Sequence, residues 1–278
     1  MKSTQKQALI TRTLIASAVA FALIAPAAHA AAIHDASLFT NTLPANDDDS
    51  TGLVNLGFTG NINSTNYTQT YVNNNGNITF NNPMGTYTPS AINSGTFGPI
   101  IAPFFADVDT RATGSLPVTY GSATLGGFNV FGVNYIHVGV FYKQPIYNDF
   151  QLILTDRSDI GTGDFDIQFN YDSIGWEAGT ASGAPPGGLG GQSALVGYWT
   201  SPTSNATLPG SLVNGALVNG GPNALISNSL NSNVLGQYNF QVRNGAVVNN
   251  DVPEPASLAL LGIGLAGLGA IRRRKAAK

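Results

Sequence analysis

The sequence predicts an all-β fold, a sandwich-like antiparallel domain flanked by a signal-peptide helix and a C-terminal transmembrane helix. Three observations support the β domain. Short apolar stretches alternate with polar residues at a period of two, and clusters of Gly, Asn, Pro and Asp separate these stretches. The third observation is that no window between the terminal segments has a helical repeat. The 278 residues include 33 Gly and 28 Asn, a composition typical of proteins with many turns.

The clearest strand is expected over 164–171, where every second residue from Phe165 to Tyr171 is apolar and the residues between them are polar. This alternation places one face on a core and the other in water. Another strand, over 148–155, precedes it, and the turn-rich residues between the two predict a β-hairpin. Further strands are expected at 53–58, 68–73, 77–80, 99–105, 128–133, 135–142, 194–200 and 238–243. This number of short strands is typical of a sandwich or a barrel.

Residues 31–251 are expected to form one β domain, which is large enough to bury a core without disulfide bonds. Within it the composition changes at two segments. Residues 179–191 are almost all Gly, Ala, Ser and Pro, and 201–233 are rich in Ser, Asn, Gly and Leu. We interpret both as long surface loops, with a linker as the alternative. The sequence has no cysteine, which excludes a thiolate zinc site and a Cys nucleophile.

Residues 1–30 have the pattern of a secretory signal peptide. Three basic residues near the start precede an apolar run over 14–24, which is too short to span a membrane comfortably. A small-x-small pattern ends at Ala30. Cleavage is therefore expected between Ala30 and Ala31, with an uncleaved N-terminal anchor as the alternative.

The C-terminal end carries three features in a fixed order. A Pro-Glu-Pro motif at 252–255 comes first. An apolar run over 256–271, which has no charged residue, follows it and is expected to form a short membrane span. The basic tail 272–278 comes last, and the positive-inside rule places it in the cytoplasm. A permanent tail anchor is the alternative to a processed signal. The candidate signal residues are Val252, Pro253, Glu254 and Pro255 before the span, and Arg272, Arg273 and Arg274 after it.

Together, residues 252–278 resemble the PEP-CTERM sorting signal of Gram-negative bacteria. The resemblance implies recognition by exosortase, a membrane-embedded Cys-dependent enzyme that is expected to cut near the Pro-Glu-Pro sequence. The protein would cross the inner membrane, be held there transiently by its C-terminal helix, and then reach the cell surface or the extracellular matrix.

The charge distribution excludes one class of partner. Between residues 31 and 255, 15 acidic residues face only four basic ones, a net charge of −11. Such a surface repels phosphate backbones, so nucleic acid is not expected as a partner. The acidic run Asp47-Asp48-Asp49 is interpreted as a solvated loop.

Several motifs in the middle of the chain resemble the nidogen-like (NIDO) extracellular domain. They follow the family's order across about 55–243, and they lie at 71–80, 101–111, 148–155, 169–171 with 174–177, and 232–240. Segment 114–120 looks longer than the corresponding turn of the family, and 232–240 looks compressed, which affects the expected loop geometry. NIDO domains occur in extracellular matrix and cell-surface proteins. The resemblance therefore implies adhesion or matrix contact, without naming a ligand.

Few residues are suited to catalysis. The mature chain has only His34, expected in a flexible N-terminal stretch, and His137, expected on the surface of a strand. No Gly-x-Ser-x-Gly elbow is present for a serine nucleophile. Glu177 stands beside Trp176, a pairing that sugar hydrolases use, but the NIDO resemblance places Trp176 in a strand motif, which implies packing as the favoured role. We therefore expect no catalytic residues and no enzymatic activity.

Asp107 and Asp109 are weak candidates for a cation site. At positions i and i+2 of an extended chain, their side chains project to the same side and can reach one hard cation such as calcium. Arg111 offers an alternative, because it can neutralise the pair by charge-assisted hydrogen bonds. We favour this structural role, since the sequence has no calcium-loop signature. No cofactor is expected, with calcium as the open possibility.

The combined expectation is an exported, non-enzymatic surface protein. It would act in cell–matrix adhesion or in the exopolysaccharide matrix of a biofilm after exosortase processing. Its ligand would be a matrix polysaccharide or a surface protein, contacted by polar loops and by aromatic residues such as Tyr198 and Trp199. A self-associating coat protein without a specific ligand is the first alternative. A secreted polysaccharide hydrolase that uses Glu177 is the second.

Overall fold

The computed structural model describes residues 31–93 and 95–248. The predicted signal peptide 1–30 and the whole sorting segment 252–278, with its expected membrane helix, lie outside the described residues. Helix in the described part is confined to three short 3-10 turns, η1 (Ala36–Leu38), η2 (Thr180–Ser182) and η3 (Leu225–Ser227). None of these turns has the length or the apolar character needed to cross a bilayer.

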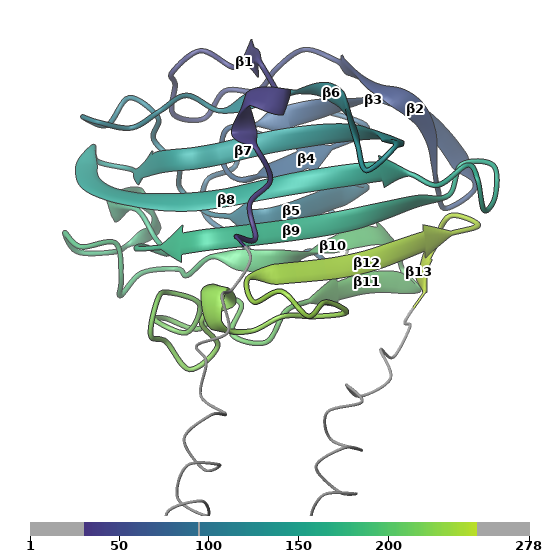
Figure 1. Cartoon of the computed structure of the whole chain (residues 1–278). Coiled ribbons are helices and arrows are strands. Elements are labelled where there is room, and N and C mark those ends of the chain that lie inside the picture. Colours follow the sequence, from purple (N-terminus) through teal and green to yellow (C-terminus); the bar gives the residue numbers. More distant parts are fainter. Residues whose placement is uncertain (1–30, 94, 249–278) are drawn as a thin grey trace, which may run out of the picture. The chain divides into compact units, whose positions relative to one another are not determined.

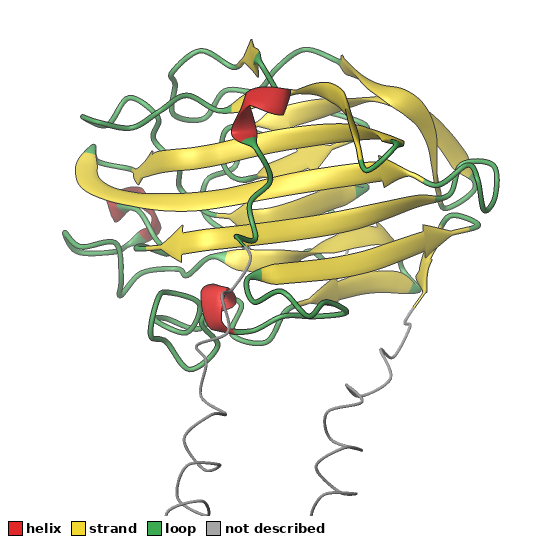
Figure 2. Ribbon diagram, viewed as in Figure 1, coloured by secondary structure: helices red, strands yellow, loops and turns green. Residues whose placement is uncertain are grey.

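The domain consists of two antiparallel β-sheets, one in front of the other in Figures 1 and 2. The front sheet has seven strands, in the order β1 (Asn41–Thr42), β6 (Thr119–Leu125), β7 (Phe128–Val140), β8 (Gln144–Asp156), β9 (Phe165–Ile174), β12 (Gln237–Arg243) and β13 (Ala246–Val248). The second sheet has six, in the order β11 (Ser204–Thr207), β10 (Leu195–Ser201), β5 (Ile100–Phe105), β4 (Asn77–Thr79), β3 (Thr65–Asn73) and β2 (Val54–Ile62).

This arrangement confirms the all-β, sandwich-like prediction, and the barrel alternative is wrong because the strands form two separate sheets. The predicted hairpin is also present: β8 pairs with β9, and Leu152 lies opposite Phe169. The strands predicted at 128–133 and 135–142 are one strand, β7. Its register shifts between Tyr135 and Val138, around a left-handed φ of 54° at His137.

The main core lies between the two sheets. Alternate residues of β9 from Phe165 to Tyr171 are buried there, as their period of two predicts. Phe104 of β5 meets Phe150 of β8 with 5.3 Å between ring centroids, which joins the two sheets directly. Aromatic contacts of this kind add to the stabilisation that burial of apolar area provides.

Two smaller apolar clusters cover parts of the outer sheet faces. Met84 and Ile92, in the long connection between β4 and β5, pack against the outer side of β5, so that all six residues of this strand are buried. On the other sheet, Phe39, directly after η1, packs against Val130 of β7 and Ile153 of β8. These covers explain why β5 has a continuous apolar sequence and not an alternating one.

Four strands were not expected from the sequence: β1, β6, β11 and β13. They are short, or they lie at or next to a sheet edge, and their side chains are largely exposed or half-buried. The segment 201–233, interpreted as a loop, contains β11 and η3. Its Leu217 and Leu225 belong to the main core, which a linker between domains would not do.

Candidate functional site

The asparagine-rich turn between β3 and β4 organises one end of the domain. Four asparagines between 73 and 77 are buried, and buried amides require hydrogen-bond partners. The Asn74 amide donates to the carbonyls of Asp47, at 2.5 Å, and Val108, at 2.7 Å. The side-chain oxygen of Asn75 accepts a hydrogen bond from the Val108 backbone N–H at 2.9 Å. The turn therefore joins the segment around Asp47 to the residues that follow β5.

Asp107 and Asp109 follow β5 directly, and both are buried. The carboxylate of Asp109 accepts two hydrogen bonds from the Arg111 guanidinium, at 2.8 and 2.9 Å, and one from the Arg111 backbone N–H. This is the structural pairing that the sequence indicated, but it involves Asp109 alone. The Oδ2 atom of Asp107 is buried without a hydrogen-bond partner in the described part of the chain.

Asp107 lies instead beside Asp47 and Asp48. One carboxylate oxygen from each of the three lies within 4.8 Å of the other two, and we call these residues the Asp cluster. Asp48 accepts a hydrogen bond from the Asn75 amide at 2.8 Å, and Asp47 forms an ion pair with Arg111 at 2.7 Å. The interpretation of this acidic run as a solvated loop is therefore wrong for Asp47 and Asp48, which are half-buried.

Burial and mutual repulsion raise the pKa of two carboxyl groups in the Asp cluster. Burial, together with the charges of Asp47, Asp48 and Asp109, raises the pKa of Asp107 to about 7, against a hydrogen bond with Ser182 that lowers it. The pKa of Asp47 is raised to about 6 by burial and by the neighbouring carboxylates, against the attraction of Arg111. The cluster therefore holds more negative charge than its single guanidinium neutralises.

Sequence reasoning missed Asp47 and Asp48 as partners of Asp107, because the chain separates them by about 60 residues. Two local signals were present: an uninterrupted Asp run, and an asparagine run whose amides need partners if they are buried. The two signals are connected only in the folded structure, where the β3–β4 turn forms hydrogen bonds both to the segment at Asp47 and Asp48 and to Val108.

Glu177 has no exposed surface. Its carboxylate accepts a hydrogen bond from the Ser193 hydroxyl and three from the backbone N–H groups of Gly215, Leu217 and Val218, at 2.7, 2.6 and 3.2 Å. Glu177 thus anchors a long loop from inside. The hydrolase hypothesis loses the residue on which it depended, because an enclosed carboxylate with four donors is not accessible to substrate.

The aromatic residues named from the sequence are largely enclosed. Trp176 is fully buried, and its indole N–H donates to the Val138 carbonyl at 3.2 Å. Tyr198, expected to contact a ligand, is 4% exposed and packs edge-to-face on Phe240, so that expectation is wrong. Trp199 is half-buried and packs against the loop that covers β5.

The two histidines lie in different environments. His34, expected to be flexible, is held on the outer face of the front sheet: its backbone N–H donates to Gln151 at 3.0 Å, and its ring lies 2.7 Å from the Gln168 side-chain oxygen. His137 is exposed, as expected, and stacks on Tyr147 with 3.8 Å between ring centroids. Neither contact forms a nucleophile–base pair.

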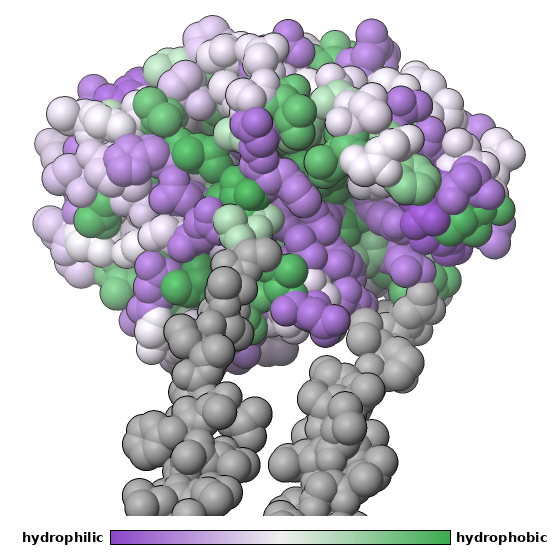
Figure 3. All heavy atoms as spheres, viewed as in Figure 1, coloured by the Kyte–Doolittle hydropathy of each residue, from purple (hydrophilic) through white to green (hydrophobic). Residues whose placement is uncertain are grey.

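Amide side chains form a row across the outer face of the front sheet. The Gln151 amide of β8 donates to Asn134 of β7 at 2.8 Å, and the Gln168 amide of β9 donates to Asn239 of β12 at 2.9 Å. Figure 3 shows a band of hydrophilic residues across this face. The predicted polar side of the strand at 164–171 contributes to this row.

A groove of about 260 Å³ lies at the β9–β12 end of this row, and we call it the amide groove. Asp166 lies in it between two cations, since its oxygens contact Arg157 at 2.8 Å and Arg243 at 2.6 Å. The charge of this carboxylate is therefore neutralised. The lining residues are Thr155, Asp166, Gln168, Asn231, Asn239, Phe240 and Gln241.

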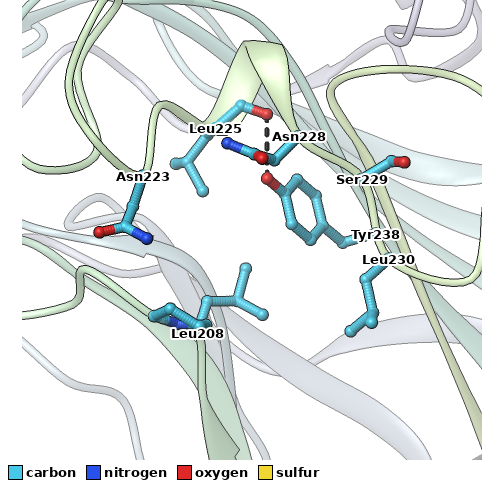
Figure 4. Close-up of a pocket in the computed structure, with 8 residues that line it drawn as sticks. Leu208, Asn223, Leu225, Asn228, Ser229, Leu230 and Tyr238 are labelled. Atoms are coloured by element: carbon cyan, nitrogen blue, oxygen red, sulfur yellow. Dashed lines mark hydrogen bonds between the residues drawn. The ribbon is translucent and has the colours of Figure 1, made fainter.

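A second pocket, of about 230 Å³, lies beside η3 (Figure 4). Its wall is mainly apolar, with Leu208, Leu225 and Leu230 around the ring of Tyr238. The Tyr238 hydroxyl donates to the Leu225 carbonyl at 3.1 Å, so its polar end is occupied within the protein. Asn223, Asn228 and Ser229 also line the pocket, and the side chains of Asn228 and Ser229 already donate to backbone carbonyls of the protein.

Comparison with known proteins gives two family matches. The nidogen-like domain matches residues 68–244, and the PEP-CTERM protein-sorting motif matches residues 251–275. Alpha-tectorin from Gallus gallus is 30% identical over 220 residues, and alpha-tectorin from Mus musculus is 31% identical over 222 residues. These alignments cover 70% and 72% of this chain but 10% of each alpha-tectorin, so the chain spans about a tenth of the length of these relatives. No solved structure matches the chain.

Proposed function

Because the chain belongs to the nidogen-like domain family and carries a PEP-CTERM sorting motif, we propose that it is an exported protein that attaches non-covalently to neutral polysaccharide of its own matrix. The two matches support export, exosortase processing and a place at the surface or outside the cell. Matrix attachment and the identity of the ligand are the proposed part.

The sorting motif supports the proposed export of the protein and its processing by exosortase. A family match over 251–275 includes the residues Val252 to Pro255 and the arginines from Arg272 to Arg274. We propose that exosortase recognises these residues while the apolar segment 256–271 holds the protein in the inner membrane. Processing then releases the β domain toward the surface.

The amide groove is the observation that carries the ligand proposal. Each Asn or Gln side chain offers two N–H hydrogens and a carbonyl oxygen, which match the donor and acceptor character of sugar hydroxyls. Gln168 and Asn239 each use one hydrogen from their amide nitrogen in the described bonds. Each amide nitrogen carries a second hydrogen, and both side chains line the groove.

Charge favours a neutral polymer over an acidic one. The described residues have 13 acidic side chains and four basic ones, and the arginines at the groove are already paired with Asp166. A polyanion would therefore meet net repulsion, and the two arginines beside the groove are already paired with carboxylates.

The proposal is tested in the producing cells. The matrix fraction and the culture medium are compared, by quantitative immunoblot, for the wild-type protein and the double variant Gln168→Ala/Asn239→Ala. Asn129→Ala is the matched control, since Asn129 is an exposed amide on β7 of the same sheet. We expect the double variant to shift from the matrix fraction to the medium, with the control distributed as wild type.

Equal retention of the double variant would contradict the groove proposal. If the purified protein instead assembles with increasing concentration and shows no saccharide binding, the coat-protein alternative replaces it.

A further inference from the structure

We propose that Asp47, Asp48 and Asp107 bind one calcium ion, which fastens the segment before β2 to the end of β5. The three carboxylates come from two chain segments that the β3–β4 turn brings together. The site is independent of the amide groove, so the failure of either proposal leaves the other intact.

The strongest observation is a buried carboxylate oxygen without a hydrogen-bond partner. Asp107 is 1% exposed, contributes an oxygen to the Asp cluster, and has an Oδ2 atom without a hydrogen-bond partner in the described residues. The Oδ1 atom of Asp47 is likewise buried and without a partner there. Buried polar atoms are rarely left in this state, because their lost hydration is not replaced. A bound cation supplies the missing partner for both residues.

The basic side chain beside the Asp cluster, Arg111, is already paired with carboxylates. The Arg111 guanidinium bonds both oxygens of Asp109 and one oxygen of Asp47. Asp48 and Asp107 have no ion pair in the described structure. One guanidinium therefore serves four neighbouring carboxylates, and a divalent cation restores the balance.

The donor set indicates the kind of ion. All donors in the Asp cluster are carboxylate oxygens, and among the described residues no histidine or cysteine joins them, which favours a hard cation over zinc. Calcium accepts about six to eight oxygen ligands in a flexible geometry, whereas magnesium requires a nearly ideal octahedron and keeps several of its waters. Three carboxylates contributed by two separate chain segments are therefore better suited to calcium.

The test uses the full-length protein freed of metal with a chelator. Calcium chloride is titrated by isothermal titration calorimetry, and thermal unfolding is measured with and without it. We expect one calcium per chain and a rise in Tm of about 5–10 °C at calcium a hundredfold above Kd. Magnesium chloride should give a smaller rise.

Two variants report on the site. Asp107→Asn and Asp48→Asn should each weaken calcium binding at least tenfold, and Asp48 is half-buried, so its variant is the easier of the two to fold. Asp172→Asn, which changes an exposed carboxylate of β9, should bind calcium as wild type does. The absence of calcium-dependent heat and Tm change, an equal response to magnesium, or unchanged calcium binding by both site variants would overturn the proposal.

Discussion

Asp107 and Asp109 leave β5 two residues apart, yet their carboxylates have different partners. Both oxygens of Asp109 bond the Arg111 guanidinium, whereas Asp107 faces the carboxylates of Asp47 and Asp48. The same residue type in one short motif therefore has two roles: one closes an ion pair, and the other contributes to a site of excess negative charge. The two roles predict opposite responses to substitution.

Substitution of Arg111 by Ala should destabilise the fold with or without calcium. Asp109 would remain buried without its cation, and breaking a buried ion pair costs about 3–5 kcal/mol. Because 41% of the Arg111 side chain is exposed, we expect a smaller loss, about 2–3 kcal/mol in the free energy of unfolding. Urea unfolding measures it. Lys143→Ala, at an exposed position, should change the free energy by less than about 0.5 kcal/mol.

The chelated protein should become more stable as the pH falls from 8 toward 5. The folded-state pKa of Asp107 is about 7 and that of Asp47 about 6, both above the ordinary value of 3.8. Folded protein therefore binds protons more tightly than unfolded protein, and this stability is lost as the pH rises through 6 and 7. The Tm measured in chelator across this range tests the sign.

In the same chelated state, Asp107→Asn should raise the Tm at pH 8, because it removes one of the repelling charges around Asp47 and Asp48. The pH dependence of the variant should also be flatter than that of wild type. A lower Tm with an unchanged pH profile would mean that Asp107 stabilises the fold by itself and that repulsion in the Asp cluster is weak.

Glu177→Gln should destabilise the protein without revealing a lost activity. The substitution places an NH₂ group among donors from Ser193, Gly215 and Leu217, so at least one hydrogen bond to a charged acceptor is lost. Each such bond contributes about 1.5–3 kcal/mol. Chemical denaturation measures the change. Release of sugar products by wild-type protein that disappears in the variant would instead support the hydrolase alternative.

Gly76→Ala should be among the most damaging single substitutions. Gly76 has a φ of 73°, and an added Cβ would lie 1.8 Å from the Phe104 carbonyl oxygen. Gly127 has a similar φ of 88°, but no atom lies within 4 Å of the added Cβ. Gly127→Ala should therefore cost only backbone strain, about 1–2 kcal/mol, and Gly76→Ala substantially more. Similar losses in urea unfolding would contradict the close packing of the turn on β5.

The sequence predicts the strands of the sheet centres well, because burial of one face imposes a period of two. The segment from Phe165 to Tyr171 is the clearest example. The edge strands β1, β11 and β13 lack this constraint, since few of their side chains are buried, and they were missed. The bulge at His137 was missed for another reason: its backbone conformation depends on the neighbouring strands.

The candidate site was only half predictable. The motif at 101–111 identified Asp107 and Asp109, but their different partners depend on the turn at Asn74 and Asn75, which brings a distant segment to the end of β5. The enclosure of Glu177 and of Tyr198 is likewise set by packing between segments far apart in the sequence. No local pattern records such contacts.

The most direct test of matrix attachment is a binding isotherm of the purified protein on the producing cells' own exopolysaccharide, measured for wild type, Gln168→Ala/Asn239→Ala and Asn129→Ala. The proposal predicts saturable binding by wild type and by the Asn129 variant, and binding at least tenfold weaker by the double variant. Absence of saturable binding by wild type, or equal affinity of all three proteins, would contradict it.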